Sequence, residues 1–224
     1  MSGWIDLNAD LGEGEPTDGE LLKSVSSCNI ACGGHAGDDA SMIAVLKLAK
    51  AHAVAVGAHP SYPDREGFGR RAMEMGLDKL ATSLGQQVET LKTHAQALGL
   101  TLAHLKPHGA LYNQAARDTA LAALLADLII THLPGACLVG PPMSALAEAA
   151  ASRGIDYLAE GFADRAYLAD GSLMPRTQPD AVLDSDEARV AQALQLATRQ
   201  SVTCPAGETI ALPVQTICLH GDSE

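Results

Sequence analysis

The sequence contains few aromatic residues, and its basic residues are outnumbered by acidic ones. Phe, Trp and Tyr together make up 3% of the 224 residues, so the core must consist mainly of aliphatic side chains. Stacking of bases or sugars on aromatic rings is therefore not expected as a main activity. Lys and Arg number 15 against 27 Asp and Glu, which gives a formal net charge of -12. Because an acidic chain repels phosphate backbones, we expect no nucleic-acid partner.

Several well-known signals are also missing. The five cysteines form no C-x-x-C pair, and we expect them to be reduced thiols of a cytoplasmic protein. The first residues lack the basic and apolar regions of a signal peptide. The most apolar stretch, residues 119–133, is too short to span a membrane. The motifs G-x-x-x-x-G-K-[ST] and G-x-S-x-G do not occur, so the sequence predicts neither a P-loop ATP site nor a serine nucleophile elbow.

Short apolar segments alternate with helical patterns along the whole chain. The apolar segments are almost continuously hydrophobic, which is typical of parallel strands buried on both faces. We predict strands at residues 4–8, 28–32, 53–58, 102–105, 137–140, 155–159 and 216–219. We predict helices at residues 38–52, 77–98, 118–132, 144–153 and 186–199. This alternation, without a break in composition, predicts a single α/β domain over residues 1–224.

Seven strands fit an incomplete or distorted barrel better than a six-stranded doubly wound sheet. Periodicity alone does not decide whether the barrel closes. A small hairpin is expected within residues 202–214, beside the last strand. The connections at residues 60–76 and 161–183 are long for a compact domain, and loops of that length are usually lids or binding loops.

Polar residues with adjacent glycines follow six of the seven predicted strands. In a β/α barrel the carboxyl ends of the strands open on one face, where such proteins keep their active sites. We therefore predict one polar cleft at this face. The residues expected there as catalytic groups are Asp10, His35, Lys106, His108, Glu160 and Asp164. The residues expected to bind substrate are Asn8, Glu13, Asn29, His59, Arg70, Arg165 and His220.

This set of side chains limits the possible chemistry. Carboxylates and histidines beside a Lys and an Arg suit activation of water and stabilisation of developing negative charge. His108 follows a proline and precedes a glycine, so we expect a fixed backbone conformation that directs a proton-exchanging side chain into the cleft. A divalent metal is possible on Asp10, His35 and His59, but their spacing is not diagnostic and an obligatory metal is not expected. The histidines without glycine or acidic neighbours are interpreted as ordinary: His52, His94, His104 and His132.

Six segments resemble the LamB/YcsF family, whose members form the A component of 5-oxoprolinase. The resemblance spans nearly the whole chain, with the motifs in the same order. The motifs are D-L-N-A-D-L-G-E at 6–13, N-I-A-C-G-G-H-A-G-D at 29–38, G-A-H-P-S-Y-P-D-R-E-G-F-G-R-R at 57–71, L-K-P-H-G-A-L-Y-N at 105–113, E-x-F-A-D-R-x-Y at 160–167 and L-H-G-D at 219–222.

The resemblance implies a distorted seven-stranded (β/α) TIM-like barrel of the glycoside hydrolase/deacetylase type. It also implies ATP-dependent opening of the lactam 5-oxo-L-proline to L-glutamate together with subunits B and C, with ATP handled by those partners. Family members usually continue past H-G-D into a final helix, which we expect to be missing here. Two alternatives remain: a stand-alone metal-dependent amidohydrolase or carbohydrate deacetylase, and a non-catalytic subunit that only binds the lactam.

Overall fold

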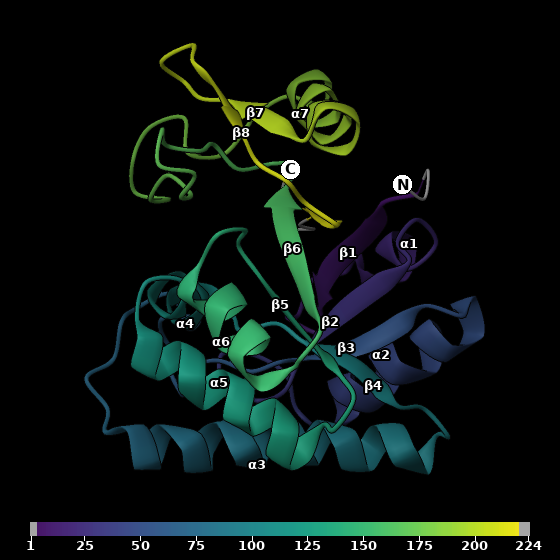
Figure 1. Cartoon of the computed structure of the whole chain (residues 1–224). Coiled ribbons are helices and arrows are strands. Elements are labelled where there is room, and N and C mark those ends of the chain that lie inside the picture. The colour runs from purple at the N-terminus through teal and green to yellow at the C-terminus, as the bar shows by residue number, and fades with distance from the viewer. Residues whose placement is uncertain (1–3, 220–224) are drawn as a thin grey trace.

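The predicted strands form a closed barrel. The computed structural model describes residues 4–219 (Figure 1). Seven parallel strands are hydrogen-bonded in the order β1-β2-β3-β4-β5-β6-β9, and β9 pairs with both β6 and β1. The predicted fold class, a distorted seven-stranded TIM-like barrel, is confirmed. The strands are β1 (Asp6–Leu11), β2 (Ser27–Ala31), β3 (Ala55–His59), β4 (Leu102–Leu105), β5 (Cys137–Gly140), β6 (Tyr157–Phe162) and β9 (Thr216–Leu219).

Two of the strands end three residues later than hydrophobicity predicts. β1 extends to residue 11 rather than ending at residue 8, and β6 extends to residue 162 rather than 159. Both extensions contain polar side chains, including Asp10 and Glu160. Glu160 is only 1% exposed, because its side chain lies among polar partners rather than in solvent. A hydrophobicity pattern treats such residues as strand ends although they belong to the strand.

The longer helices begin where the sequence predicts, and in most of them a side chain caps the start. These helices are α2 (Asp39–His52), α3 (Leu77–Ala97), α5 (Thr119–His132), α6 (Ala145–Arg153) and α7 (Asp186–Arg199). Asp38 and Ser41 form a capping box at α2, and Asp118 accepts two backbone N–H bonds at α5. Two helices were not predicted, α1 (Asp18–Leu21) and α4 (Gly109–Ala115), because they are too short for a periodic pattern.

The chain between β6 and β9 forms a separate group of elements. α7 is followed by the predicted hairpin, which is confirmed as the antiparallel pair β7 (Ser201–Thr203) and β8 (Thr209–Ala211). In Figure 1 these elements lie at the opposite end of the molecule from α3. They pack on a second apolar cluster that includes Phe162 of β6 and Ile217 of β9. No helix within residues 4–219 is both long and apolar enough to cross a membrane.

The long connection after β3 is held in place by hydrogen bonds within itself and to the loop after β2. The Asp64 carboxylate accepts from the Gly67 N–H and from the Arg71 guanidinium. Arg65 donates to the carbonyls of Gly33 and Gly37, in the loop that follows β2, at 3.1 and 2.8 Å. The two loops are thereby fixed to each other.

Gly57 in β3 provides a test of how tightly the barrel interior is packed. A Cβ atom at this position would collide with the imidazole of His104, which is buried on the neighbouring strand β4. Overpacking of a core typically costs about 1–3 kcal/mol. We therefore expect Gly57→Ala to lower the free energy of unfolding in urea by about 2 kcal/mol. Gly19→Ala is the matched control, because an added Cβ there meets nothing within 4 Å. An unchanged unfolding free energy for Gly57→Ala would contradict the packing described here.

Candidate functional site

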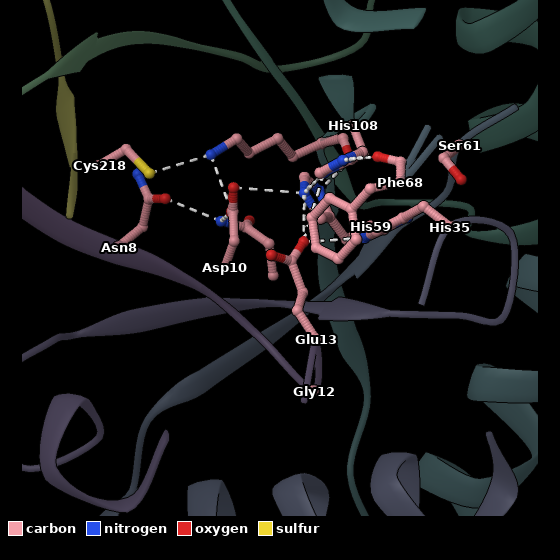
Figure 2. A network of polar contacts seen from close by, with 12 residues as sticks. Asn8, Asp10, Gly12, Glu13, His35, His59, Ser61, Phe68, His108 and Cys218 are labelled. Carbon is pink, nitrogen blue, oxygen red and sulfur yellow. Dashed lines mark hydrogen bonds and ion pairs between the residues drawn. The ribbon is translucent and has the colours of Figure 1, made fainter. Parts of the chain in front are cut away.

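A single polar network lies at the carboxyl ends of the barrel strands (Figure 2). Asp10 lies near the end of β1, and His59 is the last residue of β3. Lys106 follows β4, and Glu160 and Cys218 come from β6 and β9. Strands that are far apart in the sequence thus contribute side chains to one place, as the strand-end pattern predicts.

Lys106 is the centre of one half of this network. Its ammonium nitrogen lies 2.9 Å from Asp10 Oδ1, 2.9 Å from Glu160 Oε1 and 3.2 Å from Cys218 Sγ. The Lys106 side chain is 2% exposed. Burial alone would lower the pKa of Lys106, but the surrounding carboxylates raise that pKa well above its usual range. The network therefore holds a permanent positive charge between two carboxylates. The ammonium also lies 5.1 Å from the centroid of the Phe162 ring, within cation–π range.

Two asparagines and a histidine support the carboxylates from inside the barrel. Asn8 donates to Glu160 Oε1 at 3.0 Å. Asn29 donates to Asp10 Oδ1 at 2.8 Å and to Asn8 Oδ1 at 2.8 Å. His104 Nε2 lies 2.8 Å from Asn29 Oδ1. Asn8 and Asn29 were expected to contact substrate, but their amides are used to hold Asp10 and Glu160. Neither asparagine lines the cavity described below.

The other half of the network consists of Glu13 and three histidines. Glu13 Oε1 lies 2.8 Å from His35 Nε2, 3.3 Å from His108 Nδ1 and 3.8 Å from His59 Nε2. The potential ligand atoms of these four residues all lie within 4.8 Å of one another. Figure 2 shows Glu13 and the histidines pointing toward a common centre. This convergence is compatible with a divalent metal ion.

Unusual backbone conformations bring these side chains together. Gly12 has a φ of 76°, so the chain turns directly after β1 and presents Glu13. Phe68 has a φ of 53°, a conformation that non-glycine residues rarely adopt. Its ring packs edge-on against His35 and His108, at centroid distances of 5.2 and 5.4 Å. The rings of His35 and His108 are stacked 3.6 Å apart.

The rings of His35 and His108 are neutral in this environment. Burial, together with the neighbouring His59, lowers the pKa of His35 to about 2. The same two causes lower the pKa of His108 to about 2. A ring with so low a pKa keeps its lone pair at neutral pH but accepts a proton only weakly. The environment of His108 therefore favours a role as an electron-pair donor over the proton exchange expected from the sequence.

A cavity of about 1100 Å³ opens beside the network. Asp10, Glu13, His59, Lys106 and His108 form its inner end. The cavity is much larger than a single five-membered ring. Basic and acidic residues line it in equal number, although the chain as a whole is strongly acidic. The basic ones are Arg70, Lys106, Arg117, Arg165 and Arg176.

Arg165 is the most buried arginine of this cavity, at 7% exposure. Its guanidinium donates to the carbonyls of Met174 and Ala181 at 2.6 and 3.2 Å. These carbonyls fix the position of the guanidinium, and the neighbouring Asp164 carboxylate offsets part of its charge. Burial and the nearby Arg176 lower the pKa of Arg165 to about 10, so it remains a cation at neutral pH. A fixed cation of this kind favours an anionic group in the cavity.

The structure separates the predicted site residues into three groups. Those that line the cavity are Asp10, Glu13, His59, Arg70, Lys106, His108, Glu160 and Arg165. His35 lies behind His108, and Asp164 is buried outside the lining, with its backbone carbonyl bonded to Leu183. His220 lies outside the described residues. Of the three metal ligands suggested by the sequence, His35 and His59 belong to the cluster, which also contains Glu13 and His108, whereas Asp10 Oδ1 lies 2.9 Å from the Lys106 ammonium.

Sequence reasoning did not single out several residues that the structure places in the site. Phe68 contacts two histidines, and Tyr112 and Phe162 line the cavity. His104, interpreted as ordinary, bonds Asn29 inside the barrel. Phe68, Tyr112 and Phe162 all occur inside the six family-like motifs, so their place in those motifs was a usable signal. His104 and Cys218 carry no such signal, because each looks like a core residue of a strand.

Comparisons with known proteins agree with this architecture. The model of the LamB/YcsF family matches residues 5–224. The chain is similar to a lactam utilization protein from Thermus thermophilus, with a TM-score of 0.90 and 38% identity, over 96% of this chain and 90% of that chain. It is also similar to a protein described as an alpha-L-fucosidase from Bacteroides thetaiotaomicron, with a TM-score of 0.51 and 8% identity, over 97% of this chain and 61% of that chain. The second likeness concerns the fold alone.

Proposed function

The chain belongs to the LamB/YcsF family, and from this premise we propose that it is the lactam-cleaving subunit of an ATP-dependent 5-oxoprolinase, which converts 5-oxo-L-proline to L-glutamate. The observation that carries the proposal is the buried Lys106 ammonium, held between Asp10 and Glu160 at the inner end of a cavity that also contains the fixed guanidinium of Arg165. The relative of known structure that is 38% identical is named for lactam utilization.

The chemistry explains why ATP is needed. An unstrained lactam is a poor electrophile, and phosphorylation of its amide oxygen gives a more reactive imidate phosphate. Water then adds to the amide carbon while the C–N bond breaks and the nitrogen takes up a proton. The product is an acyl phosphate, which a second water hydrolyses to L-glutamate and phosphate. Both steps develop negative charge on oxygen, and a preorganised cation stabilises such charge.

The residues of the cavity suit these steps. Arg165 is positioned to bind the substrate carboxylate, since its guanidinium is held in place by two backbone carbonyls. Lys106 faces the oxygen that carries the phosphoryl group. Asp10 is the candidate that orients the attacking water, because its second oxygen, Oδ2, faces His59 at 3.3 Å while Oδ1 binds Lys106. Arg70 lines the same cavity and adds a second cation for the phosphoryl group.

ATP and the partner chains form the second part of the proposal. The sequence has no P-loop motif, so we assign the ATP-binding step to subunits B and C. The size of the cavity supports this assignment, because it leaves space beside a lactam for a phosphoryl group delivered from a partner. We place the complex in the cytoplasm, where ATP is available.

An omission assay tests the proposal. We expect L-glutamate to form from 5-oxoproline only when this chain, subunits B and C, and ATP are all present. The chain alone should neither hydrolyse ATP nor open the lactam. Glutamate and ADP are measured in parallel, with each component left out in turn. Glutamate formation by the single chain without ATP would contradict the proposal.

The same assay separates the two other functions. A stand-alone metal-dependent amidohydrolase is favoured by the Glu13 and histidine cluster, and it would cleave amides without ATP or partners. A subunit that only binds lactam would leave the maximal rate unchanged when its cavity residues are replaced, and only the KM for 5-oxoproline would rise.

A further inference from the structure

Two ring nitrogens in the cluster make a contact that neutral imidazoles do not make by themselves. His59 Nε2 and His108 Nδ1 lie 2.9 Å apart. At this distance one of the two atoms must donate a hydrogen, or some other positive centre must lie between them. The second nitrogen of each ring decides which of these applies, because a neutral imidazole carries one N–H group only.

The tautomer of His59 is set by a backbone carbonyl. His59 Nδ1 lies 2.8 Å from the carbonyl oxygen of Lys106. A carbonyl oxygen can only accept, so Nδ1 carries the hydrogen. The Nε2 atom of a neutral His59 is therefore a bare lone pair, and it faces His108 Nδ1 at 2.9 Å, Asp10 Oδ2 at 3.3 Å and Glu13 Oε1 at 3.8 Å.

His108 is fixed in the same way. Its Nε2 atom lies 2.9 Å from the carbonyl oxygen of Phe68 and must donate to it. The Nδ1 atom of a neutral His108 is then a lone pair as well. Both lone pairs face each other at 2.9 Å, and the Glu13 carboxylate oxygen lies 3.3 Å from the His108 nitrogen. The arrangement is repulsive unless a cation lies among these atoms.

A proton would make fewer of these close contacts favourable than a metal ion would. One proton between His59 and His108 would relieve their contact alone. His35 Nε2 also points at the same Glu13 oxygen, at 2.8 Å. A metal ion accepts electron pairs from all four groups at once.

We propose that Glu13, His35, His59 and His108 form a binding site for one divalent transition-metal ion of the zinc type, at the inner end of the cavity. Three imidazoles and one carboxylate suit zinc and similar ions rather than magnesium or calcium, which prefer oxygen ligands. Ligand atoms about 2.0–2.1 Å from a common tetrahedral ion lie about 3.3–3.4 Å apart. The distances of 2.8, 2.9, 3.3 and 3.8 Å found here surround that range.

The outer contacts are those of a metal site. Metal-bound histidines usually donate their second N–H to a carbonyl or carboxylate, which fixes the ring. His59 and His108 both do so, through Lys106 and Phe68. The segment 106–108 therefore supplies a cation, a carbonyl that orients His59, and a ligand. The left-handed φ of Phe68 places its carbonyl on His108, which gives that rare conformation a reason.

The metal site stands independently of the lactam reaction, so it is tested by binding rather than turnover. The full chain, stripped with chelator and dialysed, is titrated with zinc chloride and separately with cobalt chloride. We expect saturation near one equivalent per chain. The cobalt form should show visible ligand-field bands, and X-ray absorption of the zinc form should show nitrogen or oxygen ligands at about 2.0–2.1 Å with imidazole scattering.

Variants link the binding to these residues. Glu13→Gln and His59→Gln should each weaken zinc binding by about 100-fold or more, since even outer contacts are worth 10- to 100-fold. His132→Gln is the matched control, because His132 makes a similar contact with Glu89, at 2.8 Å, on the surface helices. It should bind zinc as the wild-type chain does.

Three results would overturn the site. These are no saturable binding of either metal, binding that both variants retain, and a zinc spectrum without imidazole scattering. The spectrum uses the wild-type chain, so it decides the question even where a variant does not fold. A negative omission assay would contradict the proposed lactam reaction but not the metal site. A failure to bind metal would contradict the metal site but not the lactam reaction.

Discussion

Replacing Lys106 by Met is expected to abolish most lactam cleavage in the reconstituted enzyme. The change removes the cation that faces the developing charge, and loss of one such group typically lowers kcat by about 100- to 1,000-fold. It also leaves Asp10 and Glu160 close together without their shared ammonium. Breaking a buried ion pair costs about 3–5 kcal/mol, so the free energy of unfolding should fall as well. Glutamate formation and urea unfolding are measured on the same preparation.

Leu84→Ala is the control for the stability effect. Leu84 is fully buried on α3, and its truncation should cost about 2–5 kcal/mol without touching the cavity. At a temperature where both variants are folded, Leu84→Ala should turn over 5-oxoproline normally. Lys106→Met with a normal kcat and a raised KM would show that Lys106 only binds substrate.

Replacing His108 by Gln is expected to lower turnover by about 100-fold, because it removes one ligand of the proposed metal site at the inner end of the cavity, and losing even an outer contact of such a site typically costs about 10- to 100-fold. The amide does not reproduce the ring nitrogen that faces His59 and Glu13. The protein should still fold, losing about 1 kcal/mol for the hydrogen bond to Phe68. Turnover in the reconstituted enzyme and the melting temperature are the two quantities to compare.

A purely structural role of His108 predicts the opposite pattern, a clearly lower melting temperature with near-normal turnover. His132→Gln controls for the removal of a histidine in general. A pH profile adds a second readout: because burial keeps His108 neutral down to about pH 2, its replacement should not remove a titration step near neutrality. Loss of a step near pH 6–7 would restore the proton-exchange role that its sequence context suggests.

The barrel was predictable because its signals are local and repeated. Apolar strand segments and capped helix starts such as Asp118 lie in the sequence itself. The errors occurred where polar side chains belong to strands, as at Asp10 and Glu160. Barrel closure was not predictable from periodicity, since it depends on the pairing of β9 with β1 across more than two hundred residues of sequence.

The sequence predicted most of the residues of the site, but it did not predict which of them contact one another. Glycine-rich strand ends identified the right face, and most of the predicted residues line one cavity. Which of them contact each other depends on backbone geometry that sequence does not reveal, such as the turn at Gly12 that brings Glu13 among the histidines. Asp10 was a possible metal ligand by sequence, but its Oδ1 atom lies 2.9 Å from the Lys106 ammonium, and the cluster of four potential ligands contains Glu13 instead. The sequence also did not reveal that the amides of Asn8 and Asn29 bond Glu160 and Asp10, and their contact with substrate stays a prediction.

The cavity beside Lys106 is, in the proposed function, the place where the lactam opens. The most direct measurement is the location of 5-oxoproline in crystals of this chain assembled with its partner subunits and a non-hydrolysable ATP analogue. We predict the lactam inside the cavity, with its carboxylate on Arg165 and its amide oxygen toward the Lys106 ammonium. Ordered 5-oxoproline bound elsewhere in the assembly, with this cavity filled only by solvent, would contradict the proposed function.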